Sequence, residues 1–219
     1  MNRCRKISLI LAAAAGLVGS ARGAEPHVYQ ADGVKIGEVL TTEATVWTRL
    51  TRRADLNRQG VPFSKVNKHR AIHEGVADGQ VPPGVKLEEM QDAVPGAAGE
   101  VRVTWSPEQA GAGGSEVAST AWTPVDPLHD FTHQFHLTGL VPGTWYRLLV
   151  ESRGPDAVAG ASVEGRFKTM PAPDTVAPVR FIVTTCHDDW RRDDPENGFK
   201  VYPTMRDWAP DFFIQTGDF

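Results

Sequence analysis

The feature that most constrains this chain is a series of short apolar runs, separated by turn residues, along residues 33–170. Several runs alternate apolar and polar residues, which is typical of half-buried antiparallel strands. Turn clusters such as Asp32-Gly33, Pro142-Gly143 and Gly154-Pro155 separate them. The pattern predicts strands at residues 34–40, 44–50, 100–105, 131–137, 145–151 and 163–168. Regular short strands punctuated in this way predict an all-β sandwich.

One of the turns makes the prediction more specific. It reads Leu140-Val141-Pro142-Gly143-Thr144-Trp145-Tyr146. A Leu, then Pro-Gly-Thr, then Tyr resembles the corner that enters the sixth strand of fibronectin type III and related sandwiches, where the Tyr hydroxyl bonds back to the backbone. This resemblance implies a fibronectin type III/Ig-like domain over residues 24–170. Such a domain can mediate adhesion or serve as a scaffold, because a fold does not fix a function.

A long segment at residues 51–99 interrupts the strand pattern. It contains Pro82-Pro83-Gly84 and few apolar residues, although residues 86–92 could form a short helix. A long connection inside a small domain is usually functional or disordered. We therefore keep two interpretations: mobile decoration, or an insertion that reaches over the mouth of a site and shapes substrate entry. Its basic cluster at residues 65–70 is interpreted as a solvated loop face.

Three histidines, His129, His133 and His136, are close enough in sequence to suggest a metal site. On a strand at residues 131–137, however, successive side chains point to opposite faces of the sheet. His133 and His136 would then face opposite ways and could not bind one ion without a bulge. We interpret all three as structural residues.

A second unit is predicted after a proline-rich linker at residues 171–178. An apolar strand at residues 179–185 is followed by a short helix at residues 202–208 and a second strand at residues 211–216. A strand–helix–strand order predicts a parallel strand pair with a right-handed crossover. The two strands end at Cys186 and at Gly217-Asp218, and polar side chains at the carboxyl ends of parallel strands commonly build sites.

Several short stretches of this second unit, in order, resemble the start of a PhoD-like (alkaline phosphatase D) metallophosphatase domain. The stretches are residues 181–186, Gly198-Phe199, Tyr202, Pro210-Asp211-Phe212 and Gly217-Asp218-Phe219. The resemblance implies an α/β metallophosphatase sandwich of which residues 179–219 hold only the start. PhoD-like enzymes also carry an N-terminal sandwich, so the two resemblances agree in their order along the chain.

The chemistry implied by this resemblance is metal-dependent hydrolysis of phosphomonoesters or phosphodiesters. Cys186 aligns with a thiolate ligand to Fe³⁺, and Asp218 aligns with a carboxylate that bridges two ions, while Ca²⁺ is the other ion implied. A two-metal site both neutralises phosphate charge and activates water. The three residues after Cys186 are candidates for supporting the metal ligands or for contacting the substrate. They are His187, Asp188 and Asp189. We interpret Tyr202 as a residue that packs the short helix against its surroundings.

The remaining ligands of the family would lie beyond Phe219. The sequence therefore predicts that the 219-residue chain is a fragment that binds metal weakly and is inactive alone. Residues 179–219 are also expected to be too few to build a self-sufficient core.

The amino terminus has the pattern of a secretory signal peptide over residues 1–23. A basic start precedes an apolar run at residues 7–18, and Ala21-Arg22-Gly23 provides a small-residue cleavage site near Gly23. The run is too short to serve as a membrane anchor. This pattern predicts a periplasmic or extracellular protein, in which the single remaining cysteine, Cys186, cannot form an intramolecular disulfide.

Charge further restricts the partners of the exported chain. The sequence has 23 Lys and Arg against 27 Asp and Glu, and four of the basic residues lie in residues 1–23. The mature chain is left with 19 basic and 27 acidic residues, a net charge of −8. Such a surface repels nucleic acids and anionic membranes, so a small-molecule phosphoester is the expected partner.

Two alternatives remain beside the PhoD-like interpretation. A purple-acid-phosphatase-like hydrolase can also pair a fibronectin-like domain with a metallophosphatase, but its first strand would end in Asp and not in Cys186. The other alternative is a secreted β-sandwich binding module without catalysis.

Overall fold

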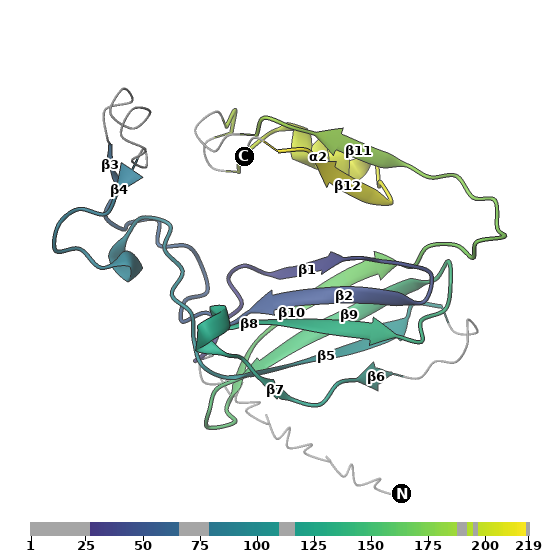
Figure 1. Ribbon diagram of the computed structural model, residues 1–219, viewed down its shortest axis with the longest axis horizontal. Coiled ribbons are helices and arrows are strands. Elements are labelled where there is room, and N and C mark those ends of the chain that lie inside the picture. The colour runs from purple at the N-terminus through teal and green to yellow at the C-terminus, as the bar shows by residue number, and fades with distance from the viewer. Residues whose placement is uncertain (1–26, 66–78, 110–116, 188–191, 195–196, 218–219) are drawn as a thin grey trace, which may run out of the picture.

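Two antiparallel sheets packed face to face form the larger part of the molecule (Figure 1). The computed structural model describes residues 27–65, 79–109, 117–187, 192–194 and 197–217. The first sheet has the order β1-β2-β8, formed by Val34–Gly37, Glu43–Arg49 and Thr132–Thr138. The second has the order β10-β9-β5-β6, formed by Ala159–Lys168, Trp145–Arg153, Glu100–Pro107 and Ala118–Ser119, and β7 (Thr123–Pro124) also pairs with β5. The predicted fibronectin type III-like sandwich is confirmed, whereas the short strands β6 and β7 were not predicted.

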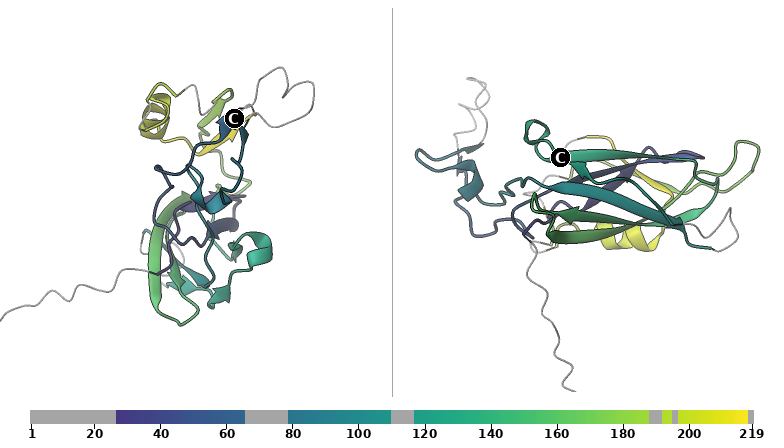
Figure 2. Two further views of the ribbon diagram at one scale, coloured as in Figure 1. Left: turned by 90° about the vertical axis from the view of Figure 1, so that its left-hand side faces the viewer. Right: turned by 90° about the horizontal axis from the view of Figure 1, so that it is seen from below.

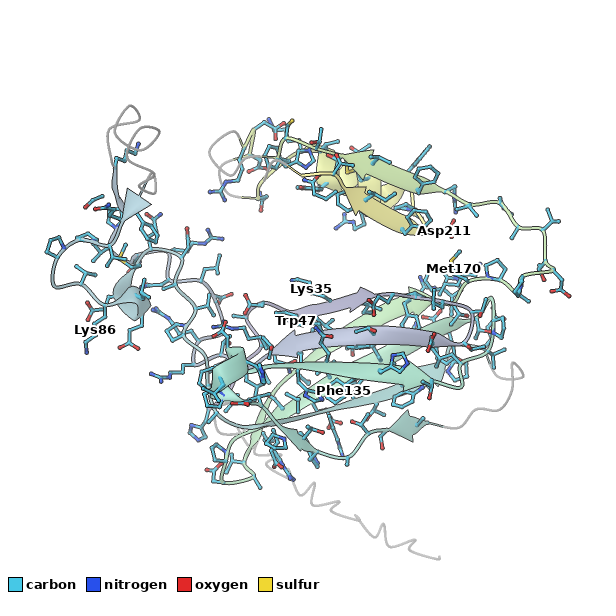
Figure 3. All side chains as sticks on the ribbon, in the orientation of Figure 1. Lys35, Trp47, Lys86, Phe135, Met170 and Asp211 are labelled. Atoms are coloured by element: carbon cyan, nitrogen blue, oxygen red, sulfur yellow. The ribbon has the colours of Figure 1, made fainter. Side chains whose placement is uncertain are left out.

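The core lies between the sheets because alternate residues of each strand point inward. In β2, Ala44, Val46 and Thr48 are fully buried, while their neighbours are half-exposed. The pattern repeats on the facing sheet, where Val103 and Val150 are fully buried. Burying a side chain of this size contributes about 1.5–3 kcal/mol, so the period-2 pattern supplies most of the driving force for the sandwich. Figure 3 shows Phe135 of β8 in this layer, and Lys35 and Trp47 on the first sheet.

The predicted tyrosine corner is present at the entrance to β9. Tyr146 is buried, and its hydroxyl accepts a hydrogen bond of 2.9 Å from the backbone amide of Val141. Its ring stacks on Phe167 with the ring centroids 5.4 Å apart. The hydroxyl of Thr169 donates to the carbonyl oxygen of Val141 at 2.6 Å, so the corner is tied to the end of β10 as well.

The histidines lie as the strand pattern predicts. His133 is on the inner face of β8 against Phe135, with ring centroids 4.5 Å apart, and burial lowers its pKa. His136 is on the opposite face and lies 2.9 Å from Glu43, whereas His129 ends the 3₁₀ turn η2 (Pro127–His129) 3.3 Å from Asp126. The three side chains do not converge on one point.

Ion pairs and tryptophans cover the outer face of the second sheet. Arg102 forms a two-bond ion pair with Glu151, at 2.7 and 2.9 Å, and Arg153 pairs with Glu100. Trp122 stacks against both guanidiniums, at 4.7 Å from Arg102 and 4.5 Å from Arg153. These contacts cover the outer face of a sheet whose inner face forms the core.

The described parts of the insertion at residues 51–99 make contacts with the sandwich and with one another. Arg49 lies at its base, and its guanidinium donates to the carbonyl oxygen of Val94 at 2.9 Å and pairs with Asp32 and Asp130. Further out, the side chain of Asn57 donates to the carbonyl oxygen of Met90 at 3.1 Å, and Met90 itself is 1% exposed. A single buried methionine therefore gives this segment a small core of its own.

The elements of the insertion are short. They are β3 (Ser64–Lys65), β4 (Gly79–Gln80) and the 3₁₀ turn η1 (Leu87–Glu89), which replaces the predicted helix at residues 86–92. The basic residues 68–70 lie outside the described part of the chain. The insertion projects from one end of the sandwich in Figure 1 and in the right panel of Figure 2.

The linker carries the chain from the sandwich to a small α/β unit. Met170 still belongs to the sandwich, because its amide donates to the carbonyl oxygen of Leu40 at 3.1 Å, and an exposed stretch leads from it to β11 (Phe181–Thr184). Helix α2 (Val201–Asp207) and β12 (Phe212–Gln215) follow. Figure 3 marks Met170 before this crossing and Asp211 at the start of β12. No helix in the described part of the chain is long and apolar enough to cross a membrane.

The β11–β12 pair is parallel and in register, as predicted, but one of its faces is open. Phe181 pairs with Phe212 and Val183 with Ile214, so these four side chains share a face. Their exposed fractions range from 39% for Ile214 to 53% for Val183. These four side chains therefore form a small apolar patch on one face of the strand pair.

Candidate functional site

The ends of β11 and β12 form one edge, to which both strands deliver polar residues. The backbone amide of Thr216 donates to the carbonyl oxygen of Thr184 at 3.0 Å, which continues the ladder past the last paired residues. The backbone amide of Cys186 then donates to the carbonyl oxygen of Gly217 at 3.3 Å. The hydroxyl of Thr185 donates to the same oxygen at 3.0 Å. Cys186 and Gly217 are therefore neighbours, as their places at the ends of parallel strands predict.

Cys186 has an unusual backbone conformation at this edge. Its φ is +58°, in the left-handed region, and its side chain is exposed. A residue other than glycine held in this region costs about 1–3 kcal/mol and persists only where its surroundings fix it. Six other described residues that are not glycine also have a positive φ, among them Asp130, Phe131 and Ala209, so this conformation alone does not mark Cys186 as functional.

Gly217 also has a left-handed backbone, with φ +117°. A Cβ atom built on it would meet nothing within 4 Å. Glycine is therefore favoured here by its conformation and not by lack of space. The chain turns away from the sheet immediately before Asp218.

The predicted site residues divide into two groups. Asp188, Asp189 and Asp218 lie outside the described residues. Cys186 and His187 are described, and they point to different surroundings. The ring of His187 packs against the segment that leads into α2, stacked on Phe199 with centroids 4.8 Å apart and edge-on to Tyr202 at 5.1 Å.

His187 is therefore held by protein groups. Its Nδ1 lies 2.8 Å from the hydroxyl of Tyr202, and its Nε2 lies 2.9 Å from the hydroxyl of Thr184. The sequence suggests two roles for His187, support of a metal ligand or contact with a substrate. The observed contacts fit the first role, because contact with a substrate would require the ring to leave Tyr202 and Thr184. Sequence reasoning assigned Tyr202 to helix packing and missed its hydroxyl contact. Phe199 precedes α2, and the contact depends on how the helix packs against the turn, so no local spacing in the sequence indicated it.

The described donors match only part of the metal centre that the resemblance implies. An exposed thiol at a strand end suits a transition metal such as iron, because thiolates are soft, anionic ligands. Among the described residues, however, no group of three or more His, Cys, Asp and Glu side chains is close enough to hold an ion. The described edge thus offers one thiol, and no carboxylate set for calcium.

A shallow groove of about 570 Å³ lies elsewhere, on the outer face of the second sheet. Thr104, Leu149 and Glu164 lie side by side in its lining, and Arg147 and Arg166 border it. Both arginines pair with Glu108, at 3.0 and 2.6 Å, and Arg166 also stacks on Trp145 at 3.7 Å. Arg166 and then Arg147 lower the pKa of Glu108 from 4.5 to about 2. The charges around this groove therefore largely satisfy one another.

Comparison with known proteins gives a likeness of fold. No family model matches the sequence, and no curated protein matches it significantly. A solved structure of PhoD is similar over 90% of this chain, with 17% sequence identity and a TM-score of 0.51. The chain spans 28% of the length of that PhoD chain.

Single fibronectin domains are also similar, at lower scores. The third fibronectin III domain of the human KIAA0343 protein is 15% identical, with a TM-score of 0.36 over 76% of this chain and all of that domain. The fibronectin type III domain of the human KIAA0970 protein is 10% identical, with a TM-score of 0.34 over 70% of this chain and 80% of that one. In fold, the chain is thus similar to a part of PhoD that includes both the sandwich and the strand–helix–strand unit.

Proposed function

We propose that this chain is the amino-terminal part of an exported, metal-dependent phosphoester hydrolase of the PhoD-like type. The observation that carries the proposal is the neighbouring placement of Cys186 and Gly217 at the ends of two parallel strands. The similarity of fold to PhoD over 90% of the chain supports it. The proposed substrates are small phosphomonoesters or phosphodiesters outside the cytoplasm, and nucleic acids and membranes are not proposed as partners.

In this proposal each residue at the edge has a defined role. The Cys186 thiolate would be one ligand to Fe³⁺, and the Asp218 carboxylate would bridge this ion and Ca²⁺. When bound, the ions would neutralise phosphate charge and activate water. In this proposal the hydrogen bond from Thr185 to Gly217 holds the ends of β11 and β12 together, and His187 supports the turn that contains Cys186.

Most of the site is proposed to come from residues beyond this chain. The described edge provides one thiol ligand, and one face of the strand pair is open. We therefore expect the 219-residue chain alone to bind metal weakly and to be inactive, because a single thiol and a single carboxylate leave most of each coordination shell empty.

The insertion is proposed to shape substrate entry. In Figure 1 the β3–β4 pair lies on the side to which the carboxyl ends of β11 and β12 point. The base of the insertion is held by the hydrogen bond from Arg49 to Val94, and Met90 is buried within it. Val61 and Phe63, which are exposed, are the apolar residues it offers near β3.

A second candidate function is a secreted binding module without catalysis. The observation that favours it is the sandwich itself, which has a buried core of its own and a groove of about 570 Å³ on one outer face. The purple-acid-phosphatase-like alternative is disfavoured, because Cys186 stands where that class would place an Asp.

The proposal is tested on the protein produced from its complete gene. The purified protein is assayed with p-nitrophenyl phosphate and bis-p-nitrophenyl phosphate, before and after removal of metal with a chelator. We expect hydrolysis of at least one ester, its loss on chelation and its recovery when iron and calcium are restored. No hydrolysis of either ester by metal-loaded protein would favour the binding module.

A further inference from the structure

The turn that presents Cys186 is anchored on both sides. On one side, the hydroxyl of Thr185 donates to the carbonyl oxygen of Gly217, which ties the turn to β12. On the other side, the ring of His187 is inserted between the end of β11 and the segment of α2. Cys186 lies between these anchors with φ +58°.

The His187 anchor is built from three kinds of contact. Phe199 stacks on the ring with an interplanar angle of 29°, and Tyr202 meets it edge-on at 78°. The hydroxyls of Tyr202 and Thr184 each lie within 3.0 Å of a ring nitrogen, at 2.8 and 2.9 Å. The Thr184 hydroxyl also lies 3.2 Å from Nδ1, so it contacts the edge of the ring between the two nitrogens and not Nε2 alone.

Such an anchor accounts for the strained backbone beside it. A left-handed residue other than glycine persists where its surroundings hold it in place. Since residue 187 is the next residue in the chain, fixing its ring against α2 fixes the peptide that follows Cys186. Thr184 belongs to β11 and Tyr202 to α2, so the turn joins two elements of the unit.

We propose that His187 and Tyr202 form a positioning pair, which holds the turn so that the Cys186 thiol stands at the strand-end edge. Neither residue needs to touch metal or substrate for this role. The part of the proposal that concerns metal rests on the proposed function, whereas the part that concerns the backbone at Cys186 does not.

The test uses Tyr202→Phe, which removes one hydroxyl and keeps the ring. Trp208→Phe, a change of an exposed aromatic residue at the end of the same helix, is the matched control. Thr184→Val removes the other hydroxyl and gives a second, independent variant. All are made in the protein expressed from its complete gene, and unfolding by urea checks that the overall fold is kept.

The first readout is hydrogen exchange of the Cys186 amide, which donates to Gly217. We expect about five-fold faster exchange in Tyr202→Phe and in Thr184→Val, the effect of one lost hydrogen bond on local opening, and no change in Trp208→Phe. Unchanged exchange in both hydroxyl variants would overturn the proposal, whatever the protein binds.

The second readout is titration of the metal-free protein with Co²⁺, followed by its thiolate charge-transfer absorption. We expect Tyr202→Phe to weaken Co²⁺ binding by about ten-fold or more, the usual cost of removing a group that orients a ligand. Equal affinity in the variant and the wild-type protein would contradict positioning of the ligand. If the wild-type protein shows no such absorption, the proposed metal site fails, and the exchange experiment alone decides on the positioning pair.

Discussion

The backbone amide of Cys186 donates a hydrogen bond of 3.3 Å to the carbonyl oxygen of Gly217. This bond joins two residues that follow different strands, and it places Cys186 beside the residue that precedes Asp218. Parallel strands deliver their carboxyl ends to one edge, so the contact follows from the topology. The left-handed backbone at both residues does not follow from the topology.

Replacing Gly217 with Ala is expected to loosen this edge. The Cβ atom would have free space, but φ +117° is unfavourable for alanine. We expect the substitution to destabilise the turn after β12 by about 1–3 kcal/mol. Hydrogen exchange of the Cys186 amide should therefore be faster in Gly217→Ala. Gly37→Ala is the control, because Gly37 has neither a positive φ nor an atom near its Cβ position. Equal effects of the two substitutions would show that the backbone at Gly217 is not under constraint.

Removing the hydroxyl of Tyr146 is expected to weaken the sandwich. In Tyr146→Phe the amide of Val141 loses its acceptor in a partly buried corner. The expected loss is about 1–3 kcal/mol in the free energy of unfolding, measured with urea. Tyr29→Phe provides the comparison, since its hydroxyl has no hydrogen-bond partner among the described residues, and it should lower stability much less. Similar losses in the two variants would contradict a special role for the corner.

Much of the sandwich could be predicted from the sequence because its signals are local. The alternation of apolar and polar residues in β2 and β8 indicates which residues face the core. The residues around Pro142-Gly143 predict the tyrosine corner. The strand pair at the carboxyl end was also predicted, with its parallel direction, from two apolar runs around a short helix. Each of these inferences needs only neighbouring residues and known periodicities.

Other features depend on where side chains from distant segments meet. Arg49 connects Asp32, Asp130 and Val94, and nothing near Arg49 in sequence indicates these partners. The insertion was expected to lack anchors because one buried methionine, Met90, is too weak a pattern to recognise. For the candidate site, the contact of His187 with Tyr202 likewise depends on how α2 packs, which no local spacing specifies.

Acid is expected to destabilise the sandwich partly through Glu108. The guanidinium of Arg166, together with that of Arg147, lowers the pKa of this carboxyl group from 4.5 to about 2. A carboxyl group with a depressed pKa in the folded state contributes stability above its unfolded pKa, and this contribution is lost as the pH falls through the folded pKa. The urea midpoint of the wild-type protein should therefore fall between pH 4.5 and about 2, and that of Glu108→Gln should fall less.

The measurement is a series of urea titrations across this pH range. Arg102 lowers the pKa of Glu151 in the same direction, so Glu151→Gln should also reduce the pH dependence. Parallel curves for the wild-type protein and Glu108→Gln would mean that Glu108 does not contribute to acid sensitivity.

Shortening the insertion is expected to change substrate preference and to leave the fold intact. The amide of Arg52 donates to the carbonyl oxygen of Pro95 at 2.9 Å, so the two ends of the insertion are adjacent and can be joined. Replacing residues 54–93 with two glycines keeps Val94, the partner of Arg49. In the complete protein we expect the ratio of rates for bulky and small phosphoesters to change. Equal ratios across a substrate panel, with an unaltered unfolding midpoint, would show that the insertion has no part in substrate entry.

The most direct test of the central claim is the iron content of the complete protein with and without the Cys186 thiol. Wild-type protein, Cys186→Ser and Thr185→Ser are purified in parallel, and bound iron is measured by mass spectrometry together with phosphoesterase activity. Thr185→Ser keeps the hydroxyl that bonds to Gly217 and is the matched control. The account predicts near-stoichiometric iron and activity in the wild-type protein and the control, and loss of both in Cys186→Ser. Iron and activity that are unchanged in Cys186→Ser would contradict it.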